Sequence, residues 1–208
     1  MNNLFDLTNR TALITGAGGL LGPKHAEAIV ECGGRVIMTD HHLDRAQEKS
    51  EMLNGKYGSF VSEAYHMDVT DPISVKQVVD KYKKIDILIN NAAKDPKVKK
   101  ESGLSIESRF ETMKPEYWNE GIDAALNGTF YCSQAIGNKM LETGGGVILN
   151  ISSDLGLIAP DQRIYRKEGI PEYQQNVKPI TYSAAKWAII GMTKYLAVYW
   201  AKRNIRVN

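Results

Sequence analysis

The chain has 208 residues, of which 43% are hydrophobic and 24% are charged, and its formal net charge at pH 7 is +2. This balance is typical of a globular protein and leaves room for one sizeable core. Basic residues are interspersed with acidic ones, which argues against a nucleic-acid-binding surface. No apolar run approaches the length of about 20 residues needed to cross a bilayer. We therefore expect a single domain over residues 1–208 that binds neither nucleic acid nor membrane.

Cysteine and histidine usage points to a reducing compartment and gives no sign of a metal site. Cys32 and Cys132 are far apart in the sequence. Two reduced thiols in a cytoplasmic protein are the simplest interpretation, and the first residues lack a secretory signal pattern. The four histidines show no spacing typical of zinc ligands, so no metal is expected.

Predicted strands and helices alternate along the chain. Apolar runs predict strands at 11–15, 35–40, 85–90 and 147–152, and a shorter, more polar one at 63–68. Helical spacing runs from Leu20 to about Cys32 and from about Leu43 to Gly55, and Asp71-Pro72 is a favourable helix start. Repeated strand–helix units predict an α/β fold of the Rossmann type, in which a doubly wound parallel sheet is flanked by helices on both faces. Ligands of such folds bind beyond the carboxyl ends of the strands.

Two long polar stretches interrupt this alternation. Residues 94–114 carry Lys94, Lys97, Lys99 and Lys100, and residues 156–179 are rich in charged and tyrosine residues. Loops of this length in a compact domain are usually functional or mobile. Their positive charges fit an anionic substrate such as a sugar phosphate, whereas solvated loop charges are the simpler explanation.

A glycine-rich turn, Thr15–Gly22, joins the first predicted strand to the first predicted helix. Glycines let the backbone approach a pyrophosphate, and the helix N-terminus supplies free N–H groups. A glycine cluster alone also fits a tight strand-to-helix turn. Asp40 ends the second strand, where an acid can bind the ribose hydroxyls of an adenosine and repel a 2′-phosphate. The two features together predict a dinucleotide site that favours NAD over NADP, although Asp40 also fits a helix cap.

On these motifs the chain resembles the short-chain dehydrogenase/reductase family over about residues 7–208. The resemblance rests on Thr15–Gly22, Asp68-Val69, Asn90–Ala93, Asn127, Ser152-Ser153, Tyr182–Lys186 and Asn204–Asn208. It implies that, besides Tyr182 and Lys186, the cofactor contacts Gly16, Gly19, Leu21, Gly22, Asp40, Asp68, Val69, Asn91 and Ala92. It implies further that the catalytic group consists of Asn127, Ser153, Tyr182 and Lys186.

The chemistry of alcohol oxidation explains the residue types of this catalytic group. A free phenol has a pKa of about 10 and is poorly matched to proton exchange at neutral pH. Lys186 follows Tyr182 by one helical turn, so its ammonium can stabilise the phenolate. The resemblance implies that Ser153 holds the substrate oxygen by a hydrogen bond. It also implies that Asn127 anchors a water molecule beside Lys186. Ser153 is preferred to Ser152 because it is the second of the pair, and strand alternation would point the two to opposite faces.

Three features depart from the family pattern. Leu20 stands where single-domain members have a small residue, so the glycine spacing resembles that of nucleotide-sugar epimerases and dehydratases. The interval from Ser153 to Tyr182 is longer than usual, as in dehydrogenases of bacterial surface-glycan or flagellin modification. The sequence also stops at Asn208, short of the family's usual C-terminal segment, which suggests a truncated C-terminal end and predicts poor activity.

We predict an NAD-dependent oxidoreductase of a small alcohol or ketone, with sugars and sugar phosphates as candidate substrates. Two alternatives stay open: an epimerase or dehydratase that uses NAD transiently, and a non-catalytic NAD-binding scaffold. Family members commonly form homodimers or homotetramers, and the apolar segment Trp187–Ile190 and the later Tyr195, Val198 and Trp200 fit such packing, although core burial explains most of them equally well.

Overall fold

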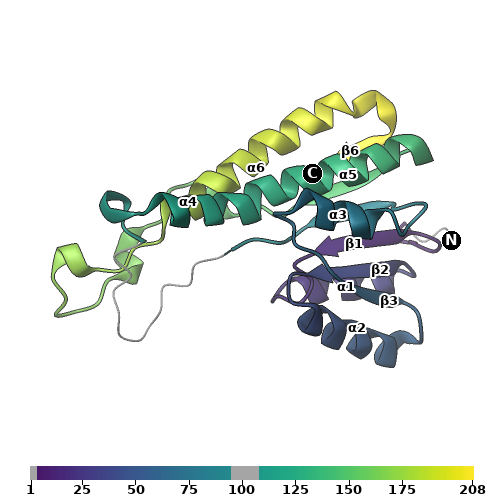
Figure 1. Ribbon diagram of the computed structural model, residues 1–208, viewed down its shortest axis with the longest axis horizontal. Helices are drawn as coiled ribbons and strands as arrows, with labels where there is room; N and C mark the ends of the chain where they lie inside the picture. Colours follow the sequence, from purple (N-terminus) through teal and green to yellow (C-terminus); the bar gives the residue numbers. More distant parts are fainter. Residues whose placement is uncertain (1–3, 95–107) are drawn as a thin grey trace.

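The computed structural model describes residues 4–94 and 108–208, and it contains a parallel sheet between two layers of helices (Figure 1). The strands are β1 (Thr11–Thr15), β2 (Arg35–Asp40), β3 (Ser62–His66), β4 (Ile87–Asn90), β5 (Gly146–Asn150) and β6 (Ile205–Val207). The α-helices are α1 (Gly22–Glu31), α2 (Leu43–Tyr57), α3 (Pro72–Val79), α4 (Pro115–Ile122), α5 (Gly128–Thr143) and α6 (Ile180–Tyr199). The strand order is β3-β2-β1-β4-β5-β6, and every neighbouring pair is parallel.

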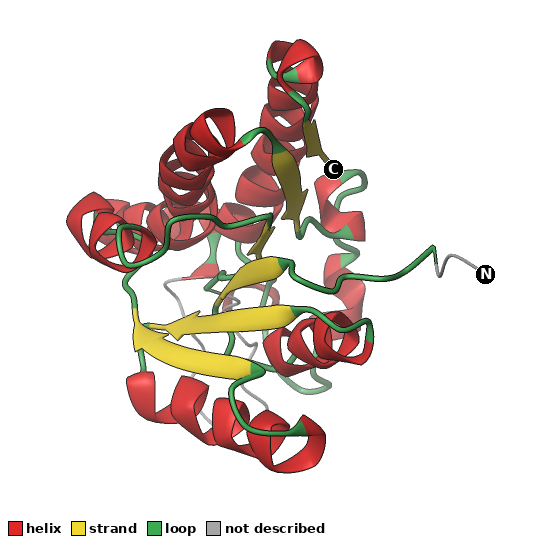
Figure 2. Cartoon of the chain, turned by 90° about the vertical axis from the view of Figure 1, so that its right-hand side faces the viewer, coloured by secondary structure: helices red, strands yellow, loops and turns green. Residues whose placement is uncertain are grey.

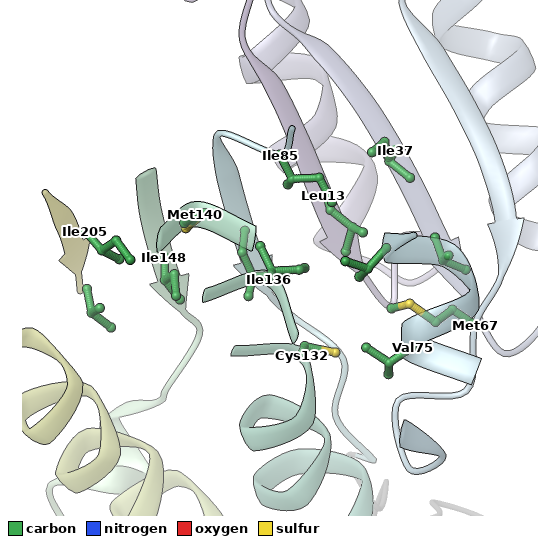
Figure 3. Packing of buried hydrophobic residues seen from close by; sticks show 14 of the residues in the cluster. Leu13, Ile37, Met67, Val75, Ile85, Cys132, Ile136, Met140, Ile148 and Ile205 are labelled. Carbon is green, nitrogen blue, oxygen red and sulfur yellow. The ribbon is translucent and has the colours of Figure 1, made fainter. Parts of the chain in front are cut away.

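Helices cover both faces of the sheet (Figure 2), and buried side chains of the strands pack against them in two clusters. On one face, Leu13, Leu88 and Ile148 form a cluster with side chains of α3 and α5 (Figure 3). On the other face, Ile14 and Met38 pack with α1 and α2. Burying each large side chain of this kind contributes about 1.5–3 kcal/mol. The predicted doubly wound sheet with helices on both faces is confirmed.

The ends of the elements follow local chemistry. The side chain of Asp71 accepts a hydrogen bond from the Ile73 N–H (2.9 Å) and begins α3, as predicted. Gly33 has φ +85°, a left-handed conformation that ends the first helical segment. Strand β5, however, ends at Asn150, two residues before the predicted limit. Both Ser152 and Ser153 therefore lie in the turn after the strand, and strand alternation was the wrong reason for choosing between them.

The 156–179 stretch is built from short turns of 3-10 helix. They are η4 (Asp154–Gly156), which begins just before it, η5 (Gln162–Tyr165) and η6 (Glu172–Gln174). The buried side chain of Gln175 bonds to the backbone of Lys167 and Ile170, and the Arg109 guanidinium donates to the carbonyls of Glu172 and Gln175. This stretch is therefore held by hydrogen bonds within itself and from Arg109. The predicted lysines 97, 99 and 100 lie outside the described residues.

Three observations concern membranes, metals and thiols. Among the described helices, none is both long enough and apolar enough to cross a membrane. Over residues 4–94 and 108–208, no group of three histidine, cysteine or acidic side chains could hold a metal ion. Cys32 and Cys132 are both free thiols, and Cys132 is fully buried.

Candidate active site

A cleft of about 770 Å³ opens where the carboxyl ends of β1, β2, β4 and β5 meet. The predicted cofactor and catalytic residues that line it are Gly16, Gly19, Leu21, Asp40, Asp68, Val69, Asn91, Ala92, Tyr182 and Lys186. Residues far apart in the sequence thus share one cavity. Gly22, Asn127 and Ser153 are not among its lining residues.

The turn after β1 requires glycine at several points, among them Gly16 and Gly22. Gly16 has φ +62°, and a Cβ on it would lie 2.9 Å from the Cα of Ala92. A Cβ on Gly22 would lie 2.5 Å from the Cα of Ala17, so Gly22 serves the packing of α1 against the turn. Leu20, which departs from the family pattern, has a side chain that is 91% exposed. Leucine is therefore accommodated there without crowding the backbone.

Asn91 and Thr15 join this turn to the end of β4. The Thr15 hydroxyl oxygen accepts from the N–H groups of Asn91 (3.0 Å) and Ala92 (2.9 Å). The Asn91 amide donates to the carbonyls of Thr15 (3.0 Å) and Gly16 (3.1 Å). The floor of the cleft is thereby fixed before any ligand binds.

Asp40 is almost completely buried at the end of β2, with 6% of its surface exposed. Its carboxylate accepts from the N–H groups of Gly18 (3.0 Å) and His42 (2.9 Å), and Nδ1 of His41 lies 3.1 Å away. The contact between Asp40 and Gly18 was not predicted, although the run of glycines in the sequence could have indicated it. His41 and Arg45 line the same part of the cleft, so a carboxylate and two potential cations meet there.

Helix α6 brings Tyr182 and Lys186 to the same cleft. Lys186 is 4% exposed, and its Nζ donates to the carbonyl of Ile151 (2.5 Å) and lies 5.7 Å from the centre of the Tyr182 ring. The Ser152 hydroxyl donates to the backbone carbonyl of Lys186 (2.9 Å). The turn after β5 is thus tied to the helix that carries the predicted pair.

Ser153 and Asn127 have partners that the sequence did not suggest. The Ser153 hydroxyl donates to the Asp154 carboxylate (2.7 Å) and accepts from the Leu155 N–H (3.2 Å). The Ser153 hydroxyl and the Leu155 N–H hold the pKa of Asp154 below its ordinary value. Asn127 ends a π-helical segment, η3 (Asp123–Asn127), and its amide donates to the carboxylate of Asp123 (2.6 Å), which lines the cleft.

A chain of buried amides connects the sheet to α6. The Asn90 amide donates to Asn150 (2.8 Å) and to the Ser133 hydroxyl (3.0 Å), and the Asn150 amide donates to the Thr193 hydroxyl (2.8 Å). These bonds join β4, β5, α5 and α6. Asn150 was not singled out from the sequence, although a polar residue at the end of an apolar run is a signal for such a role.

A second lysine lies close to Tyr182. Lys178, from the segment before α6, has its Nζ 4.2 Å from the centre of the Tyr182 ring. Lys178 also lines a second cavity of about 420 Å³, together with Phe110, Pro160, Ile180 and Trp187. Sequence reasoning noted the charge of this stretch but not this contact.

Comparisons with known proteins agree with the resemblance to short-chain dehydrogenases/reductases. A family model described as enoyl-(acyl carrier protein) reductase matches residues 17–208. The chain is 32% identical to the NAD-dependent glycerol dehydrogenase of Listeria innocua, covering 98% of this chain and 70% of that protein. A short-chain type dehydrogenase/reductase from Mycobacterium marinum superposes with a TM-score of 0.81 at 30% identity, covering 99% of this chain and 74% of that one. A gluconate 5-dehydrogenase from Burkholderia cenocepacia, in complex with NADP and tartrate, gives 0.80 at 25% identity, covering 98% and 71%.

Proposed function

This chain belongs to the short-chain dehydrogenase/reductase family and is an oxidoreductase that acts on secondary alcohols with NAD or NADP, and we propose that its substrate is a small polyol or sugar acid. The substrate class is supported by two relatives, a glycerol dehydrogenase and a gluconate 5-dehydrogenase. The observation that carries the catalytic proposal is the convergence of Tyr182 and buried Lys186 on the cleft at the strand ends.

The residues present fit a dinucleotide. Gly16 approaches Ala92 so closely that a Cβ would lie 2.9 Å from the Ala92 Cα, so the turn after β1 presents bare backbone to which a pyrophosphate could bind. Gly16, Gly19 and Leu21 would hold the phosphates, and Asp68, Val69, Asn91 and Ala92 the adenosine and ribose groups. Gly22 would support the phosphate site through the packing of α1.

We propose NAD as the preferred cofactor because the Asp40 carboxylate would accept ribose hydroxyls and repel a 2′-phosphate. His41 and Arg45 line the same part of the cleft, and their charges favour a phosphate, so the preference depends on Asp40 outweighing them.

In the proposed mechanism, Tyr182 exchanges a proton with the substrate oxygen. When bound, the nicotinamide supplies the hydride acceptor or donor at the substrate carbon. The Lys186 ammonium stabilises the deprotonated phenol and is itself oriented by the Ile151 carbonyl. Ser153 binds the substrate oxygen by turning its hydroxyl away from Asp154. Asn127 supports Lys186 through a water, while its amide stays anchored on Asp123.

Replacing Tyr182 by phenylalanine tests this assignment. General acid–base catalysis contributes about 10²- to 10⁴-fold to a rate, so Tyr182→Phe should lower kcat by at least about 10²-fold while NAD still binds. The measurement is the appearance of NADH with glycerol, gluconate and simple alcohols as substrates. Tyr173→Phe, an exposed tyrosine in the 156–179 stretch, is the matched control and should keep the wild-type rate.

The same assay separates the two alternative functions. An epimerase or dehydratase would consume a sugar substrate without accumulating NADH, and a scaffold would bind NAD without turnover by any variant. A Tyr182→Phe protein with the wild-type rate would contradict the proposed catalytic group itself.

We also propose a homodimer or homotetramer in the cytoplasm. Exposed Trp187 (54%), Tyr195 (65%) and Val198 (80%) on α6 support an interface, whereas Trp200 is buried in the core at 6% exposure. Free Cys32 and Cys132 are consistent with a reducing compartment. Light scattering of the purified chain measures the assembly, and a monomeric mass at micromolar concentration would contradict the first point.

A further inference from the structure

The ring of Tyr182 has two ammonium groups within 6 Å of its centre. Lys186, from the Tyr182–Lys186 motif, lies at 5.7 Å, and Lys178 lies closer, at 4.2 Å. Cations within about 6 Å of an aromatic ring centre interact favourably with the ring electrons. Lys178 is outside the motif and belongs to the long stretch between Ser153 and Tyr182.

The backbone of Lys178 is held by one side chain. The Lys178 N–H donates to the amide oxygen of Gln162 (2.8 Å), and the amide nitrogen of Gln162 donates to the Lys178 carbonyl (3.2 Å). Pro179 follows directly, is buried, and precedes the first residue of α6. The position of Lys178 is thus fixed by a two-point contact on one side and by the start of the catalytic helix on the other.

We propose that Lys178 is a second positioning residue for Tyr182, whose ammonium stabilises the deprotonated phenol during proton exchange. This inference rests on the proposed role of Tyr182 in proton transfer. A phenolate carries negative charge that spreads into the ring, so a cation above the ring is attracted more strongly to the phenolate than to the phenol. Lys178 is half-buried, which limits screening of its charge by water.

The charged groups around Tyr182 have identifiable partners. On α4, Glu120 pairs with Lys94, and on η3 the Asp123 carboxylate accepts from Asn127. On η4, Asp154 accepts from Ser153. These carboxylates stand on elements that pack against α6 and would disfavour the phenolate, whereas the ammonium groups of Lys186 and Lys178 would favour it. Removing Lys178 alone should therefore shift the balance towards the neutral phenol.

The direct test is a titration of Tyr182 observed by NMR in the full chain, without substrate. Tyrosine labelled with carbon-13 at Cζ reports ionisation, and Tyr182→Phe assigns the resonance. In Lys178→Met the titration midpoint should rise by about 0.5–1 pH unit, the shift expected for one charge at about 5 Å in a watery environment. Lys178→Arg should stay within about 0.3 unit of wild type, because it keeps the charge.

Controls separate this role from a structural one. Lys167→Met removes the same charge from an exposed position in the same stretch and should leave the midpoint unchanged. Gln162→Leu releases the backbone of Lys178 and should give a rise smaller than that of Lys178→Met. Thermal melts of each variant establish folding, and should Lys178→Met not fold, Lys178→Gln takes its place because it also removes the charge.

The inference is overturned if Lys178→Met leaves the Tyr182 midpoint within 0.3 unit of wild type, or if Lys178→Arg moves it as far as Lys178→Met does. A raised KM for gluconate, with the KM for glycerol and the midpoint unchanged, would instead make Lys178 a substrate-anion residue and would also overturn it. Loss of activity in Tyr182→Phe tests the proposed function separately, because the NMR titration needs no turnover.

Discussion

Asp40 is the residue on which cofactor choice depends in the proposed function. Asp40→Asn removes the charge that repels a 2′-phosphate and keeps one oxygen that can accept from Gly18 or His42. The ratio of kcat/KM for NADP to that for NAD should rise at least tenfold, which corresponds to about 1.4 kcal/mol. Asp44→Asn, on the first turn of α2, removes the same charge and should leave the ratio unchanged. An unchanged ratio in Asp40→Asn would contradict the proposed NAD preference.

Asp86 links folding to pH at the opposite end of the sheet. Burial raises the pKa of Asp86, but hydrogen bonds from Lys84, the Thr11 N–H and Arg10 outweigh it and hold the pKa below its ordinary value. A carboxyl with a depressed folded-state pKa stabilises the protein above its unfolded pKa of about 4, and this stability is lost as pH falls through the folded value.

Asp86→Asn should therefore reduce the free energy of unfolding at neutral pH by about 1–3 kcal/mol. The difference from wild type should shrink as pH falls below about 4, because the unfolded chain then binds a proton at Asp86, and it should be lost once pH falls through the lower folded-state pKa. Urea unfolding at several pH values measures both effects. A difference that stays constant down to strongly acidic pH would exclude this ion-pair contribution.

Sequence reasoning at this scale succeeds where the geometry is local. The spacing of Tyr182 and Lys186 is enough to place both on one face of a helix, because four residues span about one turn. The partners of Ser153 and Asn127 depend instead on how Asp154 and Asp123 are folded against them. Such tertiary contacts leave no periodic trace in the sequence, and the same is true of Lys178 above the Tyr182 ring.

Helix α4 packs against the first turn of α6, the helix that carries Tyr182 and Lys186. A Cβ on Gly121 in α4 would lie 2.8 Å from the Cβ of Thr181, the residue before Tyr182. Gly121→Ala should therefore shift α6, lower the free energy of unfolding by about 1–3 kcal/mol, and reduce kcat.

Gly55→Ala in α2, away from the proposed α6 interface, is the control for this substitution. Its Cβ would meet no described atom within 4 Å, so alanine should stabilise the helix by about 0.5–1 kcal/mol. Denaturant unfolding and NADH formation measure both variants. Equal free energies of unfolding for the two proteins would show that the contact between α4 and α6 accommodates the added methyl group without loss of stability.

Element boundaries were predictable for two of the strands and less so for the others. Strands β1 and β2 match their predicted limits. The limits of β3, β4 and β5 differ from the predicted ones by one or two residues, since pairing with neighbouring strands sets where a strand begins and ends. The short turns of the 156–179 stretch were not predicted, because side chain–backbone bonds such as those of Gln175 form them.

At the scale of the whole molecule, the alternation of strands and helices was enough to predict the sheet and the edge at which the site lies. Parallel strands joined by right-handed crossovers place all their carboxyl ends at one edge. The motifs after β1, β2, β4 and β5 therefore had to meet, and the cleft unites residues from Gly16 to Lys186. The closing of that cleft by α6 and the buried amides behind it required the folded chain.

Because the cleft is built from so many separate segments, cofactor binding should stabilise the entire domain. A ligand at 100 times its Kd adds about 2.7 kcal/mol to the free energy of unfolding, which for a chain of this size raises Tm by roughly 5–10 °C. Gly16→Val should abolish this rise, because its Cβ would lie 2.9 Å from Ala92 Cα and φ +62° disfavours a branched residue. Gly55→Ala in α2 meets no described atom within 4 Å and should retain the full rise. Scanning calorimetry with and without NADH measures the shift in Tm. An undiminished rise in Gly16→Val would show that the dinucleotide does not bind at the turn after β1.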